Sequence, residues 1–588
     1  MGGMVRFARL SGLYVGLWVV WSSVALAQTP APPPSQVRPP IIVPPSGGGR
    51  IGIPQVPAGA QIPGEANKLT FKLLGFDIQG EFPELVAQRK EIASPLIGKT
   101  ITLAKVFEFA DKLQQIYVRA GYPLVRVVLL PQEFADSARI KLRVIDGFVE
   151  RMDLNAIGTP VRGRVESVLA PLVHKTHLQQ RELERRLLLA GEAPGLILNA
   201  TFVAGKEVGG SVLVLTGRYR PISASVYVDD AMPAAYGTGQ VVTTVSENGL
   251  AGLGEQLAVS VAGDPEHDFF TEFPNRRYLS ATYTMPLGID GWKLELFATD
   301  GRTTPYVTIP GTETFGVFDL GHAKVIYEAI KSRDAELAFN AMFEPENESL
   351  ESIALTPPVP ISLDRIRPVR FGFDGIWRQR TEGLTVNYGA EFSQGLDALG
   401  ARTAADAAES TVPLSQQGAD AVFSKLNGHL EINKALPYDF FAAFKAYGQT
   451  SFNQPLLLPE QFDIDGANMI SGFTVGEFLG DSAWIVRGEL GRPFSTTLVP
   501  GSAATLIFTP YLFGATGERD IYQPTAVEVG SVHVFNYGLG TRFNVPSWNP
   551  DAPDTYAFVE ASNGYVNQVI APMTNNSSRI FAGVVVQY

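Results

Sequence analysis

Residues 370–378 have the sequence Arg-Phe-Gly-Phe-Asp-Gly-Ile-Trp-Arg, in which aromatic and charged side chains alternate along the chain. Because successive side chains of a β-strand point to opposite faces, one face of this segment is apolar and the other is charged. The same alternation recurs in residues 256–261 and 292–296. Aromatic side chains that face outward and charged ones that face inward are typical of a membrane β-barrel with a water-filled lumen.

About sixteen such segments, each roughly ten residues long, follow one another between Ile222 and Tyr588, and ten residues suffice for a tilted strand to cross a bilayer. The connections between them alternate in length, short at 380–383 and 433–437 and long at 394–420 and 450–481. Short turns on the periplasmic side and long loops outside are typical of bacterial barrels. The predicted fold class is therefore mainly β, with a 16-stranded antiparallel transmembrane barrel.

The beginning of the chain predicts export. Arg6 and Arg9 precede an apolar stretch, Leu10–Val20, and the small-residue site Ala25-Leu26-Ala27 follows. This pattern indicates a secretory signal peptide over residues 1–27 that is cleaved after Ala27. After residue 27 no apolar run reaches the 18 residues that a membrane helix needs, so a membrane-spanning chain must use closed strands.

Composition excludes several kinds of chemistry. The chain has no cysteine, which excludes disulfides, thiolate catalysis and sulfur-ligated metals. The net charge of −12 argues against nucleic-acid binding, which needs a basic surface. Residues 28–68 contain eleven prolines and the run Gly47-Gly48-Gly49, and we expect an extended, mobile tether with no helix long enough to plug the lumen.

Two small α/β domains are expected between the tether and the barrel. In the first, a helix that begins near Thr102 places Val106, Phe109 and Leu113 on one face. The predicted elements are a strand at 73–79, this helix, strands at 125–130 and 140–144, and then, in the second domain, a strand at 149–154, helices at 165–172 and 178–190, and strands at 196–203 and 211–215. The domain boundaries that follow are 1–27, 28–68, 69–147, 148–220 and 221–588.

Short motifs resemble one known family. Residues 117–122, Tyr-Val-Arg-Ala-Gly-Tyr, with Leu130-Pro131-Gln132, are similar to the first polypeptide-transport-associated (POTRA) domain of the two-partner secretion transporters, the TpsB or ShlB/FhaC/HecB type. Residues 183–189, Leu-Glu-Arg-Arg-Leu-Leu-Leu, resemble the end of the second POTRA helix, and residues 227–237 resemble the first barrel hairpin. The order and spacing of these motifs carry the resemblance, which covers the chain after Leu69.

The resemblance implies an inward-folded loop between the eleventh and twelfth strands, here residues 450–481. Its tip, Ile470-Ser471-Gly472-Phe473, stands where the family has a Val-Arg-Gly-Tyr-like tetrapeptide. Ser471 replaces the family's arginine, and Ala515 stands where its aspartate partner would lie. Since replacing both partners of a buried ion pair can be nearly neutral, we expect the loop to remain inside and to be held differently. Arg487 and Glu489 are expected on the wall that faces the loop.

The function that the resemblance implies is transport of an unfolded exoprotein from the periplasm, through the outer membrane of a Gram-negative bacterium, without nucleotide hydrolysis. The expected partners are a large TpsA-like, β-helical exoprotein, the lipid bilayer, and the barrel-assembly machinery, which reads a terminal aromatic residue such as Tyr588. An assembly factor or insertase is the alternative function, and a passive porin is a third. No cofactor, metal or nucleic acid is expected.

Enzymatic and metal-site interpretations find little support. His174 and His177 form an H-x-x-H pair without a third histidine or a cysteine nearby. No Ser, His and acid arrangement has supporting spacing, so we predict that the protein is not an enzyme. The glutamates at 344, 346, 348 and 351 are expected on a solvated external loop, with a weak calcium site as the alternative.

Overall fold

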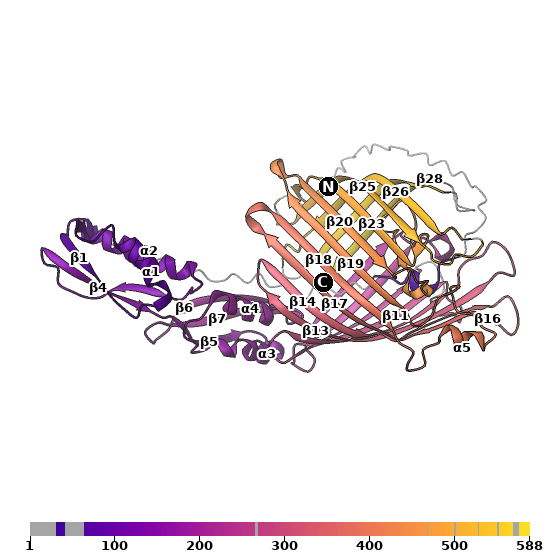
Figure 1. Cartoon of the computed structure of the whole chain (residues 1–588), viewed down its shortest axis with the longest axis horizontal. Coiled ribbons are helices and arrows are strands. Elements are labelled where there is room, and N and C mark those ends of the chain that lie inside the picture. Colours follow the sequence, from indigo (N-terminus) through magenta and orange to yellow (C-terminus); the bar gives the residue numbers. More distant parts are fainter. Residues whose placement is uncertain are drawn as a thin grey trace, which may run out of the picture.

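The computed structural model describes residues 31–40, 64–264, 269–466, 469–498, 501, 503–526, 528–549, 552–568 and 576–588. The predicted signal peptide and its cleavage after Ala27 lie outside the described residues. Figure 1 shows two small α/β units in a row, followed by a large barrel. Among the described residues no helix has the length and apolar character needed to cross a membrane.

The first small unit has a four-stranded sheet in the order β2-β1-β4-β3 with β1 and β4 parallel. Its long helix α2 starts after Thr102, whose hydroxyl caps the Lys105 N–H, and it buries the predicted face. α1 and β2 were not predicted from the sequence; α1 buries only Ala93 and has no apolar stripe. The elements are β1 Thr70–Gln79, α1 Val86–Ala93, β2 Thr100–Thr102, α2 Leu103–Arg119, β3 Arg126–Leu129 and β4 Ser137–Ile145.

The second unit has a three-stranded sheet in the order β5-β7-β6, covered by two helices. All the elements predicted for it are present, and the first helix begins earlier than expected, at Thr159, because Pro160 fits the first helical turn. Leu183 and Leu187 of the second helix are fully buried. The elements are β5 Phe148–Ala156, α3 Thr159–Leu169, α4 Gln180–Gly191, β6 Leu196–Ala204 and β7 Gly210–Tyr219.

The described strands from β8 to β28, apart from two short strands in the loop after β20, close into a 16-stranded antiparallel barrel, which confirms the predicted fold class. Three of the sixteen strands are interrupted, and each therefore carries two labels: β14 with β15, β16 with β17, and β23 with β24. The segments are β8 Ile222–Asp229, β9 Gln240–Asn248, β10 Gln256–Gly263, β11 Arg276–Leu287, β12 Trp292–Thr303, β13 Thr314–Lys331, β14 Ala335–Phe343, β15 Glu346–Ser352, β16 Val359–Ile366, β17 Pro368–Gln379, β18 Leu384–Gly395, β19 Ser424–Ala435, β20 Phe441–Thr450, β23 Ser482–Gly491, β24 Phe494–Thr497, β25 Thr505–Asp520, β26 Ser531–Val545, β27 Asp554–Val566 and β28 Asn576–Gln587.

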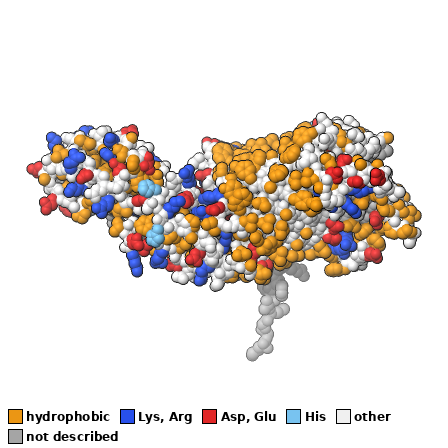
Figure 2. All heavy atoms as spheres, turned by 60° about the horizontal axis from the view of Figure 1, so that its bottom comes forward, with side chains coloured by type: hydrophobic (Ala, Val, Ile, Leu, Met, Phe, Trp, Pro, Cys, Tyr) orange, Lys and Arg blue, Asp and Glu red, His pale blue; other side chains and the backbone are white. Residues whose placement is uncertain are grey.

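The alternation on which the prediction rested is present in the wall. On β17, Phe371 and Trp377 are about half exposed on the outside, whereas Arg370 is buried in the lumen. Figure 2 shows apolar side chains spread over the barrel surface and charged ones gathered on the small units and at the barrel's far end. The barrel closes where β28 pairs with β8, and the Tyr588 N–H and C=O both bond to Ala224, at 2.8 and 3.0 Å.

Candidate functional site: the barrel lumen

The loop between β20 and β23, the eleventh and twelfth strands of the barrel, folds into the lumen. Its two short strands, β21 Phe462–Asp463 and β22 Leu479–Gly480, pair with each other, and its tip lies beyond them. Ile470, Ser471 and Phe473 are buried at the tip. The predicted loop position and the tip tetrapeptide thus coincide with a segment enclosed by the barrel wall.

A carboxylate shapes the hairpin of this loop from within. Asp465 accepts hydrogen bonds from the backbone N–H groups of Gly476, Glu477 and Phe478 at 2.8–2.9 Å. Asp463 accepts a second bond from the Gly476 N–H at 2.8 Å. Three successive N–H groups that converge on one carboxylate fix the return of the chain. The loop therefore enters the lumen as a braced hairpin.

The tip fits closely against the far wall. A Cβ atom on Gly472 would lie 2.6 Å from Asn536 Nδ2, and one on Gly564 would lie 2.3 Å from the Phe473 ring. The Phe473 carbonyl accepts a hydrogen bond from Arg579 at 2.8 Å. Glycine on both sides of the contact lets tip and wall approach to this distance.

Arg487, on β23, is the charged centre of the contact between wall and tip. Its guanidinium pairs with Glu560 at 2.7 Å and with Glu489 at 2.9 Å, and it donates to the Met469 carbonyl at 3.1 Å. The Ser471 hydroxyl donates to the same Glu560 carboxylate. The arginine that the loop lacks is thus supplied by the wall, together with an acidic partner on β27.

Ala515 lies directly opposite Arg487 on the neighbouring strand β25. It is buried in an apolar cluster that includes Ile470, Phe473 and Ile485. The Arg487 guanidinium lies 3.9 Å from the centre of the Phe513 ring, a cation–π contact. In this chain the arginine is on the wall, at 487, and a small alanine lies opposite it at 515. The resemblance implies the reverse, an aspartate at 515 that pairs with an arginine on the loop.

A second ionic anchor holds the base of the loop. Glu460, almost fully buried, pairs with Arg370 at 2.8 Å and with Lys425 at 2.6 Å. These three residues come from the loop and from strands β17 and β19, so no local sequence pattern joins them. Sequence analysis placed Arg370 on the inner face but assigned no partner to it.

The prediction of a solvated loop for the four glutamates is wrong. Glu346, Glu348 and Glu351 lie on β15, and Glu344 immediately precedes this strand. Glu346 and Glu348 are buried, and Glu344 pairs with Arg370 at 2.9 Å. Spacing by two at 344, 346 and 348 is the period of a strand with one polar face. Glu344, Glu346 and Glu348 therefore belong to the lining of the lumen.

The expectation of a free tether is also wrong for residues 31–40. This segment lies in the barrel, where Pro34–Val37 form one 3₁₀ turn and Val37 is fully buried. The Ser35 N–H donates to Glu348 at 2.8 Å, and the Gln36 amide donates to the Leu458 carbonyl of the inward loop at 2.6 Å. Proline composition describes the conformation of a free chain and does not exclude binding to a surface that fits it.

Helix α4 fastens the second small unit to the near rim of the barrel. Arg185 donates to the carbonyls of Asp290 and Glu328, at 2.8 and 2.6 Å, and Arg186 pairs with Asp290 at 2.8 Å. Glu192 at the end of the helix pairs with Lys331 at 2.6 Å. The charged motif of residues 183–189 therefore contacts the turn between β11 and β12 and the end of β13.

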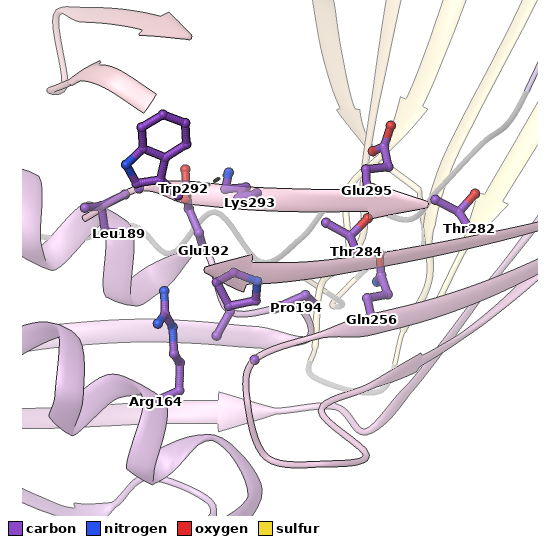
Figure 3. Close-up of a pocket in the computed structure, with 14 residues that line it drawn as sticks. Arg164, Leu189, Glu192, Pro194, Gln256, Thr282, Thr284, Trp292, Lys293 and Glu295 are labelled. Carbon is purple, nitrogen blue, oxygen red and sulfur yellow. Dashed lines mark ion pairs between the residues drawn. The ribbon is translucent and has the colours of Figure 1, made fainter. Parts of the chain in front are cut away.

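A cavity of about 390 Å³ lies in the seam between this unit and the barrel (Figure 3). Arg164, Leu189 and Pro194 line it from the small unit, and Thr284 and Trp292 from the barrel. Lys293, drawn at its edge, pairs with Glu192 at 3.1 Å. The seam is thus bridged by ion pairs and is not continuously packed.

The two histidines of the H-x-x-H pair have separate partners. The His177 ring stacks on Phe82 of the first unit, with ring centres 4.2 Å apart, and its Nδ1 lies 3.0 Å from Asp146. His174 lies against Phe148. Across the described residues no three histidine or acidic side chains are grouped as a metal site requires. His177 therefore has a contact role between the two units.

A 16-stranded barrel with two small α/β units on one rim and a loop folded into its lumen defines an outer-membrane transporter of the POTRA-barrel class. The chain belongs to the haemolysin secretion/activation family ShlB/FhaC/HecB, whose model matches residues 209–518. A ShlB-type POTRA domain matches residues 71–147. The POTRA domains of this chain are periplasmic, and the chain is a transporter of the two-partner secretion type.

Relatives agree with this assignment. The heme/hemopexin transporter protein HuxB of Haemophilus influenzae is 20% identical over 453 residues, which is 76% of each chain. The outer membrane transporter CdiB of Escherichia coli is 22% identical over 236 residues, 40% of this chain and 38% of CdiB. The solved structure of CdiB from Escherichia coli has a TM-score of 0.63 at 16% identity and covers 90% of this chain and 92% of its own. CdiB from Acinetobacter baumannii has a TM-score of 0.55 at 13% identity, with 88% and 90% covered.

Proposed function

We propose that this transporter receives an unfolded exoprotein in the periplasm on the sheet edges of its two POTRA domains and threads it through the barrel to the cell surface. We place the boundaries of its parts at residues 69–147, 148–220 and 221–588. Membership of the family implies a secreted TpsA-type partner. We further propose that this partner is β-helical and that the barrel-assembly machinery reads Tyr588 during insertion.

An available strand edge supports the receiving step. Among the described strands β6 pairs only with β7, so its outer edge presents unpaired N–H and C=O groups. Ile197 and Val203 on β6 are about half exposed. Strand addition provides hydrogen bonds without regard to side chains, which suits a client whose sequence changes as it passes.

The inward loop is the proposed gate. Its tip, Ile470 to Phe473, contacts a wall that includes Arg487, Glu489 and Ala515, and both loop and wall lie on the path through the lumen. A client can pass only where the tip has left this wall. The single observation that carries the proposal is the buried contact of Ser471 with Glu560 beside Arg487. The energy for passage comes from folding of the client outside, and the proposal includes no catalytic step.

Deletion of the gene tests the proposal directly. A large exoprotein should disappear from the surface or the culture medium and accumulate in the periplasm, and the wild-type chain supplied on a plasmid should restore it. A plasmid copy without residues 69–147 serves as the matched control, since it retains the barrel but lacks the first POTRA domain. Unchanged surface and culture proteins in the deletion strain would exclude transport.

A further inference from the structure

The wall of the barrel is hollowed over strands β25 to β28, which lie side by side (Figure 1). The hollow has a volume of about 570 Å³. Four of its lining residues form one row across the strands, each directly opposite the next: Leu512, Leu539, Ala561 and Ile580. The three large side chains are 59–64% exposed. Because Ala561 is much smaller than its neighbours, the row has a gap at β27.

A polar row borders the hollow on its extracellular side. Tyr537, Asn563 and Ser578 lie directly opposite one another on β26, β27 and β28. The Ser578 hydroxyl donates to the Asn563 side-chain carbonyl at 2.7 Å, and among the described residues the Asn563 NH₂ group has no acceptor. The ring of Tyr537 is nearly parallel to that of Tyr565, with ring centres 6.1 Å apart. An apolar floor thus adjoins a neutral hydrogen-bonding rim.

The hollow faces the bilayer and not the lumen. Asn536, Glu560 and Phe581 alternate with its residues along β26, β27 and β28, and all three are buried inside the barrel. Since successive side chains of a strand point to opposite faces, the two rows point outward. The protein is an outer-membrane barrel, so its outward face contacts lipid, and a lipid is the molecule that fills the hollow.

The polar row lies in the outer half of the bilayer. Near the periplasmic turns, Phe494 and Phe508 stack with ring centres 5.3 Å apart, and Phe543 lies opposite Phe508. Such aromatic residues mark a membrane interface. Tyr537 comes six residues before Phe543 on β26, which is about 15 Å of height for a strand tilted by about 40°. The apolar band of these barrels is about 25 Å tall, so Tyr537 lies beyond its middle.

We infer that this hollow binds one acylated saccharide of the outer leaflet, with an acyl chain over Ala561 and the acyl linkage and sugar against the polar row. This row offers hydroxyl and amide groups without a positive charge, which suits sugar hydroxyls and acyl carbonyls better than a phosphate. Arg579 also lines the hollow, but its guanidinium donates to the Phe473 and Asp230 carbonyls inside the barrel. The site does not depend on the proposed function.

The bound lipid would cover a particular part of the closing strand. β28 pairs with β27 over Asn576–Gln587, whereas it pairs with β8 over Gly583–Gln587. Ser578 and Ile580, which line the hollow, precede the residues that pair with β8. Lipid in the hollow should therefore slow amide exchange in residues 576–582.

The test counts retained lipid by native mass spectrometry. The full-length chain in detergent is mixed with an acylated glucosamine disaccharide or with phosphatidylethanolamine of equal acyl length. We expect one disaccharide per chain and roughly tenfold lower retention in Ala561→Phe, whose ring fills the gap. Ala298→Phe is the matched control, because Ala298 is an exposed alanine that alternates with the buried Phe297 and Thr299 on β12. It should retain the disaccharide as the parent does.

A milder variant keeps the test valid if Ala561→Phe does not fold. Asn563→Ala should lower retention of the disaccharide roughly threefold, since one hydrogen bond is lost. Equal retention by the parent and both variants would overturn the site. Equal retention of disaccharide and phosphatidylethanolamine would overturn the assignment to a saccharide and indicate lipid that coats the barrel without selection. Unchanged amide exchange in residues 576–582 on addition of the disaccharide would contradict its placement.

Discussion

Replacement of Arg487 by methionine should release the tip of the inward loop. Arg487 is about 1% exposed and its guanidinium serves Glu560, Glu489 and the Met469 carbonyl at 2.7–3.1 Å. Only the Met469 contact and the neighbouring Ser471 hydroxyl belong to the loop. One hydrogen bond to a charged group contributes about 1.5–3 kcal/mol, so the closed position of the loop should lose roughly 10- to 150-fold in population.

The same substitution should lower the stability of the barrel. Glu489 keeps Arg542 at 2.6 Å, whereas Glu560 keeps only hydroxyl partners, among them Tyr511 at 2.7 Å. Removing one partner of a buried ion pair costs about 3–5 kcal/mol. When samples are heated to a series of temperatures before gel electrophoresis, the band of the folded barrel should therefore disappear at a lower midpoint temperature.

Loop release can be measured separately with one introduced cysteine. Thr474→Cys, next to the tip, is labelled with a water-soluble maleimide in the parent chain and in the Arg487→Met chain. We expect labelling at least tenfold faster in the latter. Arg492→Met is the control, because Arg492 immediately follows the same strand β23 but is half exposed and contacts Asp439, Phe440 and Phe494. Equal labelling rates in the Arg487→Met chain and its parent would refute the assignment of Arg487 as the anchor.

Three further outcomes are expected. Gly472→Ala should accelerate the same labelling severalfold because its Cβ would lie 2.6 Å from the wall, whereas Gly488→Ala, where nothing lies within 4 Å, should have no effect. Arg185→Ala should raise amide hydrogen exchange in the turn 288–291 at least fivefold, since the carbonyls of Asp290, Glu328 and Ala329 lose their donor. Hydrogen bonds from the backbone N–H groups of Glu207 and Lys206 lower the pKa of Glu150 in the folded protein. The ionised Glu150 therefore contributes to stability above its unfolded-state pKa, and this contribution is lost as the pH falls through its folded-state pKa. Amide exchange in the turn 205–210, corrected for intrinsic rate, should rise below about pH 4.5, and Glu150→Gln should show the fast rate already at pH 7.

The barrel was predictable because its signal is local. An alternation with a period of two is visible within any strand, and a count of about sixteen such segments predicts the loop at residues 450–481. The structure has this loop between β20 and β23, at residues 451–481. The inward fold of this loop and its tip tetrapeptide came from the family resemblance, and the strand count only placed them in the sequence. These predictions needed no knowledge of which strands face each other across the lumen.

The partners inside the lumen were not predictable, since they are distant in sequence. Ser471 and Glu560 are 89 residues apart, and Arg370 and Glu460 are 90 apart. Only closure of the barrel brings them together. Docking of residues 31–40 depends in the same way on distant partners, among them Glu348 on β15 and Leu458 on the inward loop. The glutamates at 344, 346 and 348 differ, because their spacing by two was a visible sign of a strand and was assigned to a loop.

The position of the arginine affects how the loop can leave. In this chain Arg487, Glu489 and Glu560 all belong to the wall, so their ion pairs do not include a loop residue and need not separate when the loop departs. In the arrangement that the resemblance implies, the arginine is on the loop, and its departure separates a buried ion pair. Ser471→Arg and Ala515→Asp, combined with Arg487→Met so that the wall arginine does not pair with the new aspartate, would restore that arrangement. Because separation of the pair costs more than loss of the contacts that Ser471 and the Met469 carbonyl make to the wall, we expect this triple variant to open less often in planar bilayers, by roughly tenfold or more. Opening at the parent frequency would show that the apolar contacts of Ile470 and Phe473, and not the charges, set the cost of release.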